Sequence, residues 1–202
     1  RTTSTPTLLR AGLSDALELR LETDGFLHER SRDAATGTDE RRRGFADASL
    51  GLKWHMRDGD EAAGTPGIAW LAHLDLETGS SAFRGQGVRP SLRMVAEWEL
   101  PNEMAIGVMP GLMLDRDADG KRFAAGILAV TLSKGWTPAW RTFVEVAGQQ
   151  LASKRHGGNV ITFDTGATWL VTDDLQFDVS VARGLTSNSP DWQWGVGMAV
   201  RF

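Results

Sequence analysis

The 202-residue sequence contains no cysteine and no tyrosine, and only seven prolines. The absence of cysteine excludes a disulfide scaffold and a thiolate metal site. No window approaches the run of about 18 apolar residues that a membrane-spanning helix needs. The formal net charge of −4 is small, and no basic helix or basic-aromatic stripe occurs that would indicate nucleic-acid binding. We therefore expect no nucleic-acid partner and no cofactor.

The clearest pattern that the sequence does contain lies in residues 192–202, which alternate strictly between two faces. One face is apolar with aromatic residues at both ends, and the other is small or polar. A strand of about 9–11 residues with this pattern is long enough to cross a bilayer at a tilt. The stretch therefore predicts the last strand of an outer-membrane β-barrel. Its apolar face consists of Trp192, Trp194, Val196, Met198, Val200 and Phe202.

Ten upstream segments repeat this alternation of apolar and polar residues. The turns 14–16 and 101–103 between them are short, whereas the loops 30–44 and 79–90 are long and polar. Short turns on one side and long loops on the other are typical of outer-membrane barrels. No linker divides the chain, so we predict a single domain over residues 1–202. The predicted strands cover residues 7–13, 17–29, 46–57, 68–77, 91–100, 104–115, 123–133, 140–151, 159–171, 175–185 and 192–202.

Alternation alone also fits a soluble sandwich, but the tryptophans favour a membrane barrel. Strand directions counted back from a descending last strand place the indoles near the two membrane–water interfaces, where aromatic rings collect. Trp136 is expected in a turn. We predict an all-β fold, a transmembrane antiparallel up-and-down β-barrel. Its aromatic girdle consists of Trp54, Trp70, Trp98, Trp136, Trp140, Trp169, Trp192, Trp194 and Phe202.

The opposite faces of the predicted strands carry charges that could not all be buried in a dry core. We interpret them as the lining of a water-filled or ion-paired lumen. Two interpretations stay open: a structural ion-pair network that fills a narrow barrel, and a selectivity lining whose transverse field favours small polar or zwitterionic solutes. The predicted lining consists of Glu18, Arg20, Glu22, Lys53, His55, Arg57, His73, Asp75, Arg93, Glu97, Glu99, Arg141, Glu145, Asp164 and Asp178.

Two groups of potential ligands are candidates for a metal site. The inward-facing His55 and His73 could hold a metal or relay protons, but hydrogen-bonded filling of the lumen is the favoured interpretation. Asp115, Asp117 and Asp119 alternate as at the start of a calcium loop. This pattern lacks the bidentate glutamate at the required distance, so a solvated turn is favoured. We expect no metal site.

The count of eleven segments is odd, whereas single-chain bacterial barrels normally have even strand counts. We therefore expect a barrel of about twelve strands, whose first strand precedes Arg1. The sequence starts with this arginine rather than with methionine, and no signal peptide precedes it. This is expected of a mature or trimmed chain, or of a fragment.

Several stretches carry a resemblance to a known family: residues 5–15 with 17–20, 51–54, 77–80, 160–165, and 175–184 with the closing strand. Together they resemble the outer-membrane "transporter" family named for the MetA pathway of phenol degradation. The resemblance covers essentially the whole chain. It implies a single β-barrel of roughly twelve strands and a transport role, and it supplies no catalytic residues.

We therefore expect a pore or transporter in the bacterial outer membrane for small polar or aromatic solutes. The alternative is a structural or surface-interaction barrel with a closed, ion-paired lumen, and a third possibility is an outer-membrane hydrolase. We expect no enzyme, because the lipid-facing registers contain no histidine for a Ser–His pair. The expected partners are the lipid bilayer, lipopolysaccharide, and the barrel-assembly machinery through the terminal Phe202. The arginine-rich segment 30–43 is a candidate contact to lipopolysaccharide, and a solvated loop is the favoured interpretation of this segment.

Overall fold

The computed structural model describes residues 1–32, 39–117 and 119–202. Within these residues the chain forms fourteen β-strands and one short 3-10 helix, η1. No helix in this part is both long and apolar enough to span a membrane. The elements are β1 (Thr2–Thr3), β2 (Thr7–Gly12), β3 (Leu17–Thr23), β4 (Phe26–Arg32), β5 (Asp39–Phe45), β6 (Ala48–Arg57), β7 (Gly67–Asp75), β8 (Arg89–Leu100), β9 (Met104–Arg116), β10 (Arg122–Thr137), β11 (Trp140–Leu151), η1 (Lys154–His156), β12 (Val160–Thr172), β13 (Leu175–Gly184) and β14 (Trp192–Val200).

Eleven of the strands form one large sheet with the order β14-β13-β12-β11-β10-β9-β8-β7-β6-β3-β2, and β1-β4-β5 form a separate three-stranded sheet. The eleven predicted segments correspond one to one to the strands of the large sheet. This confirms the all-β antiparallel class. The order has two end strands, β14 and β2, within the residues described, and closure into a transmembrane barrel stays a prediction.

The chain divides into two compact units, each built from separate stretches of sequence. Unit 1 contains residues 1–55, 71–92 and 114–123, and unit 2 contains residues 56–70, 93–113 and 124–202. The prediction of a single domain over residues 1–202 stays a prediction.

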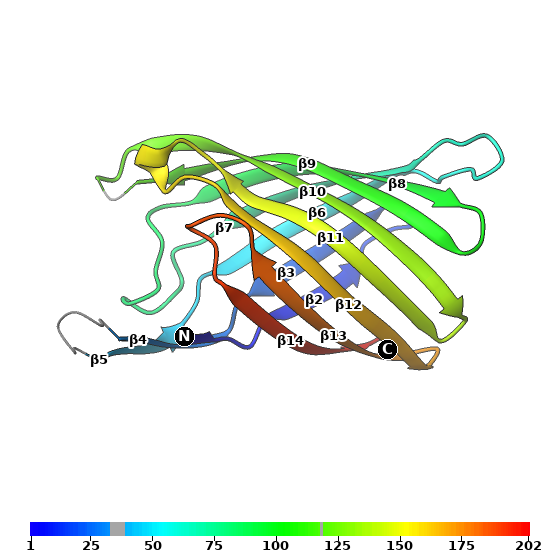
Figure 1. Ribbon diagram of the computed structural model, residues 1–202. Coiled ribbons are helices and arrows are strands. Elements are labelled where there is room, and N and C mark those ends of the chain that lie inside the picture. The colour runs from blue at the N-terminus through cyan, green and yellow to red at the C-terminus, as the bar shows by residue number, and fades with distance from the viewer. Residues whose placement is uncertain (33–38, 118) are drawn as a thin grey trace. The chain divides into compact units, whose positions relative to one another are not determined.

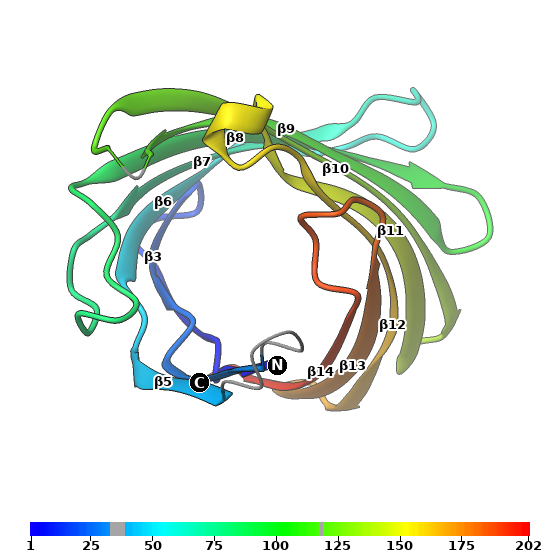
Figure 2. The ribbon, with the colours of Figure 1, turned by 60° about the vertical axis from the view of Figure 1, so that its left-hand side comes forward.

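In unit 2, the strands β11 to β14 follow one another in chain order as an antiparallel ladder (Figures 1 and 2). Across β13 and β14, Val179 pairs with Val196 and Ser180 pairs with Gly195. Because successive side chains of a strand point to opposite faces, this register keeps the valines on one face and the small or polar residues on the other. The apolar face of β13 therefore continues on β14, and so does the face with small or polar residues.

In unit 1, β3 pairs directly with β6, from Leu17 opposite Trp54 to Thr23 opposite Ala48. The intervening residues form an insertion at the end of this pair. Within it, β4 and β5 form a hairpin whose register runs from Phe26 opposite Phe45, and β1 pairs with β4. The three strands lie together near the N-terminus (Figure 1).

This insertion corrects two predictions. The expected strand 17–29 ends at Thr23, and the expected irregular loop 30–44 is in large part a hairpin, β4 and β5; its residues 33–38 lie outside the described part. Charged side chains occupy both faces of these two strands. A strand that buries neither face has no apolar–polar alternation, so its sequence carries no period-two signal.

A third correction concerns Trp136, which does not lie in a turn. Strand β10 continues to Thr137, with Gly135 opposite Arg141 and Thr137 opposite Trp140. The alternation in residues 123–133 is already weak, and the polar residues that follow hide the continuation of the strand. The turn between β10 and β11 is therefore only two residues long.

Candidate functional site

A large polar cavity of about 930 Å³ lies within unit 1. It is lined by residues of β2, β3, β6, β7 and the end of β9, together with the connection between β7 and β8. A cavity of this volume is in the range of small-molecule sites. Six carboxylates and four guanidinium groups contribute to its lining: Arg20, Glu22, Asp24, Asp47, Asp75, Arg84, Arg89, Asp115, Arg116 and Asp117.

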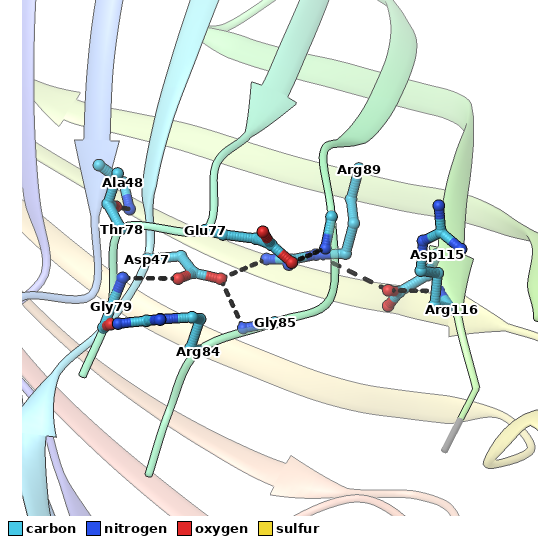
Figure 3. A network of polar contacts seen from close by, with 11 residues as sticks. Asp47, Ala48, Glu77, Thr78, Gly79, Arg84, Gly85, Arg89, Asp115 and Arg116 are labelled. Carbon is cyan, nitrogen blue, oxygen red and sulfur yellow. Dashed lines mark hydrogen bonds and ion pairs between the residues drawn. The ribbon is translucent and has the colours of Figure 1, made fainter. Parts of the chain in front are cut away.

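The Asp47 carboxylate is the centre of the hydrogen-bond network at this cavity (Figure 3). Its Oδ1 accepts a hydrogen bond from the backbone N–H of Gly79 over 2.8 Å. Its Oδ2 accepts one from the N–H of Gly85 and one from Arg89 Nη2, each over 2.8 Å. Only 10% of the Asp47 side chain and 13% of the Arg89 side chain are exposed, so these bonds form largely out of water.

Two opposing effects set the pKa of Asp47. Burial raises it, because a charged carboxylate loses hydration. The hydrogen bonds from Arg89, Gly85 and Gly79 and the positive charge of Arg89 act in the opposite direction and prevail, so the pKa of Asp47 lies below its ordinary value. The carboxylate is therefore ionised at neutral pH, and it acts as a fixed acceptor for the connection that it holds.

Further bonds attach the same connection, residues 76–88, to the strand ends. Phe45 N–H donates to Ser80 Oγ over 2.8 Å, and Ser80 N–H donates back to the Phe45 carbonyl over 2.9 Å. Ala48 N–H donates to Thr78 Oγ1 over 2.7 Å, and Glu77 accepts from the N–H of Gly87. Since residues 83–86 line the cavity, these contacts hold one wall of it in place.

A second ion-paired cluster lies on the strands of unit 1. Period two along β3 places Glu18, Arg20 and Glu22 on one face. Arg20 Nε lies 3.1 Å from Glu22 Oε1 and 3.8 Å from Glu18 Oε1, and Arg10 Nη2 lies 2.7 Å from Glu18 Oε2. His73 is almost fully buried, and its Nε2 lies 3.1 Å from Glu22 Oε1. Acids and bases therefore neutralise each other along this face.

The close approach of His73 depends on a glycine beneath its ring. A Cβ at Gly51 would lie 2.4 Å from His73 Cδ2 and 2.5 Å from its Nε2, which is closer than any side chain tolerates. The strand face thus leaves space at Gly51 for the imidazole that contacts Glu22.

Unit 2 contains a smaller cavity of about 240 Å³, lined by Glu97, Thr131, Ser133 and Glu145 among others. Thr131 lies opposite Glu145 in the ladder and donates a hydrogen bond to its carboxylate. Arg141 Nη1 donates to Ser133 Oγ over 3.2 Å. These contacts form a polar row between β10 and β11.

The structure distributes the predicted lining residues over both units. Those of unit 1 are Glu18, Arg20, Glu22, Lys53, His55, His73 and Asp75, and those of unit 2 are Arg57, Arg93, Glu97, Glu99, Arg141, Glu145, Asp164 and Asp178.

Within each unit some of these residues meet. Lys53 lies opposite Glu18 in the ladder, and Thr162 Oγ1 donates to Asp164 over 2.8 Å. Arg57 Nε donates to the Pro66 carbonyl over 3.1 Å. Asp178 lies over a glycine of β14, where a Cβ would be 2.5 Å from its carboxylate oxygens.

The predicted girdle residues pair with one another in unit 2. Trp140 and Trp169 stack with their ring centroids 5.7 Å apart, as cross-strand partners of β11 and β12. Trp192 and Trp194 stack at 6.4 Å. Trp136 Nε1 donates to Thr142 Oγ1 over 2.9 Å. Trp70 and Trp98 are half-buried in unit 2, and Trp54 and Phe202 are exposed.

Sequence reasoning missed the main polar network. Arg89 was not among the predicted site residues, because it follows a long connection and lies outside the predicted strand of residues 91–100. The distance from Arg89 Nε to Asp115 Oδ1 is 3.7 Å, across 26 residues of sequence. Arg84 and Arg89, which flank Gly85 and Gly87 in a long connection, are the signal that was available.

No group of three metal-ligating side chains occurs in the part of the chain that the structure describes. Asp117 and Asp119, from the run that resembles a calcium loop, lie in a turn, which was the favoured interpretation. Asp117 Oδ1 accepts from the N–H of Asp119 over 3.1 Å and from that of Lys121 over 2.9 Å.

The whole chain, residues 1–202, matches the model of one protein family, described as "Putative MetA-pathway of phenol degradation". A search of curated proteins found no match.

Proposed function

Because the chain belongs to the MetA-pathway family of phenol degradation, we propose that it is an outer-membrane β-barrel through which small polar or aromatic solutes diffuse. In this proposal the large sheet closes on itself, and the described charges face its lumen. The bacterial outer membrane is its location, and it has no catalytic role.

The exposure of the apolar side chains is the observation that carries this proposal. On β14, 78% of Trp194 and 89% of Val196 are exposed, and Val179 on β13 is half exposed. The other face of the same ladder carries Ser180 and Asp178. A water-soluble sheet covers its apolar face, whereas a sheet in a bilayer turns that face to lipid.

The charged lining of the unit 1 cavity is a second observation in favour of a path for polar solutes. Fixed carboxylates such as Glu22 and Asp75 line it together with guanidinium groups such as Arg20 and Arg89. Opposite charges on the walls of one cavity create a local field that orients dipolar or zwitterionic solutes.

The ion pairs of β3 favour a second candidate function. The contacts from Arg10 through Glu18 and Arg20 to Glu22 and His73 fill space and neutralise charge. A narrow barrel filled in this way would be a structural or surface-interaction barrel with no open path.

Single-channel conductance in planar bilayers separates the two candidates. The full-length protein should first show heat-modifiable gel mobility and fractionate with outer membranes. Discrete current steps are expected of a pore, and correctly inserted protein without current at any potential would leave only the closed barrel. Recovery of folded protein in the soluble fraction would reject both.

The cavity lining is tested in the same bilayers. Asp75→Asn and Glu22→Gln remove lining carboxylates and should lower the ratio of cation to anion permeability. Asp174→Asn removes an exposed carboxylate in the turn after β12 and should leave the ratio unchanged.

A further inference from the structure

The two faces of the β4–β5 hairpin differ sharply in charge. Arg30 lies opposite Arg41, and His28 lies opposite Arg43. We call this side the arginine face; its one carboxylate within the described side chains is Asp39. The opposite face carries Glu29 opposite Arg42 and Ser31 opposite Glu40. The charges of this opposite face nearly cancel. On the arginine face, the described side chains of Arg30, Arg41, Arg43 and Asp39 leave a net charge of about +2.

Contacts within the arginine face do not neutralise it. Arg30 forms a two-pronged pair with Asp39, at 2.8 Å from Nε and 2.6 Å from Nη2. Arg41 Nη2 lies 3.4 Å from the same carboxylate. Half of each of these arginine side chains is exposed. Like charges directly opposite each other destabilise a strand pair, so this placement costs stability unless an anion is bound there.

The base of the arginine face is aromatic. Phe26 and Phe45 contact each other edge to face with their ring centroids 5.4 Å apart, and they are 43% and 61% exposed. Phe45, Arg43 and Arg41 follow at two-residue steps on one face, about 7 Å apart. Moving out along the hairpin, the surface therefore changes from apolar to cationic within about two such steps.

We infer that the arginine face binds the phosphorylated headgroup of an outer-leaflet glycolipid, with the Phe26–Phe45 pair against the start of its acyl region. This inference rests on the outer-membrane location in the proposed function. Guanidinium groups bind phosphate oxygens through paired hydrogen bonds, and aromatic rings lie at the boundary of headgroup and acyl chain. A small soluble anion would satisfy the arginines but would leave the phenylalanine pair without a partner.

The position of the hairpin agrees with this occupant. It is part of the long connection between β3 and β6, and the end of β5 is bonded to the long β7–β8 connection through Phe45 and Ser80. The β2–β3 connection, at the other end of β3, is a tight turn closed by Leu17 N–H donating to Ser14 Oγ. Long connections face the cell exterior in outer-membrane barrels, where phosphorylated glycolipid forms the outer leaflet.

Binding of purified lipopolysaccharide to the full-length protein in detergent tests the inference. The Arg41→Gln/Arg43→Gln variant should bind intact lipopolysaccharide about tenfold or more weakly than the unmodified protein, since each arginine near an anionic surface contributes to affinity. Arg42→Gln is the control for position, because it removes one positive charge from the opposite face of the same strand, whereas the double variant removes two. Its affinity should stay within about twofold, a difference too small for a lost phosphate contact. Arg30 is left intact because its pair with Asp39 joins the two strands.

A second pair of measurements identifies the ligand and guards against misfolding. The Arg41→Lys/Arg43→Lys variant should keep most of the affinity, and the variants should retain heat-modifiable mobility. Enzymatically dephosphorylated lipopolysaccharide should bind weakly and equally to all of them. Equal losses in Arg42→Gln, unchanged affinity in the double variant, or full competition by inorganic phosphate would each overturn the inference. Outer-membrane fractionation of the same samples shows separately whether the proposed location holds.

Discussion

Arg89 Nη2 donates to the Asp47 carboxylate over 2.8 Å and joins two residues that are 42 positions apart. This bond is the side-chain link between the start of β6 and the start of β8 in the wall of the unit 1 cavity. It is accompanied by two backbone donors from the intervening connection.

Arg89→Gln should loosen the connection between β7 and β8. A hydrogen bond to a charged group contributes about 1.5–3 kcal/mol, so the amide of Gly85 should exchange about tenfold or more faster with solvent. Amide hydrogen exchange measures this directly. Arg201→Gln is the control, because its pair with Asp174 is exposed on both sides and such pairs contribute little. Unchanged exchange at Gly85 would show that Arg89 does not hold the loop.

Acidification should release the same connection. The pKa of Asp47 is lower in the folded protein than its ordinary value of about 3.9. Its contribution to stability is therefore fully present above that value and is lost as the pH falls through the folded pKa. Exchange at Gly79 and Gly85 should rise below about pH 4, and Asp47→Asn should remove most of this pH dependence. A rise that persists in Asp47→Asn would contradict the assignment of the pH dependence to Asp47.

The register of β13 gives a prediction about the membrane. Val179→Arg places a charge on the face proposed to contact lipid and should cost roughly 2–4 kcal/mol near mid-membrane. Ser180→Arg, on the neighbouring position, should cost much less because it faces the polar side. Urea unfolding in lipid vesicles measures both. Equal destabilisation of the two variants would contradict the proposed lipid-facing side.

Gly51→Ala should displace His73 from Glu22. The new Cβ would lie 2.4 Å from the imidazole ring, and such overpacking costs typically about 1–3 kcal/mol. The nitrogen resonances of His73 should shift as its contact with Glu22 is lost. Gly12→Ala is the control, since a Cβ there meets no atom within 4 Å. A stable Gly51→Ala variant with unchanged His73 resonances would show that the ring contact is not needed.

The large sheet could be predicted from the sequence because most of its strands carry apolar residues on one face and small or polar residues on the other. The boundaries of β11 at Trp140 and Leu151 and of β13 near Leu175 follow directly from period-two alternation. Alternation fades where both faces are polar. The β4–β5 hairpin was missed for this reason, and the end of β10 was missed because Lys134 interrupts the apolar face before Trp136.

The candidate site was predictable only in part. Arg20, Glu22 and His73 belong to alternating faces, and they do meet in the structure. The partners of Asp47 could not be predicted, because they depend on how a long connection folds back onto a strand end. Backbone donors such as the N–H of Gly79 and Gly85 are present in every sequence, and nothing in the residue types marks which of them will face a carboxylate.

The direct pairing of β3 with β6 gives the protein a natural insertion point. Their ladder is complete up to Thr23 and Ala48, and Ala46 N–H donates to the Gly25 carbonyl over 2.9 Å to close the neck of the insertion. The segment beyond this neck contributes no pair to that ladder, so a foreign epitope grafted at the neck should leave the register of β3 and β6 unchanged. Asp47 lies on the strand side of the neck and should keep its bonds to Gly79 and Gly85, whereas the Phe45–Ser80 bonds would be lost.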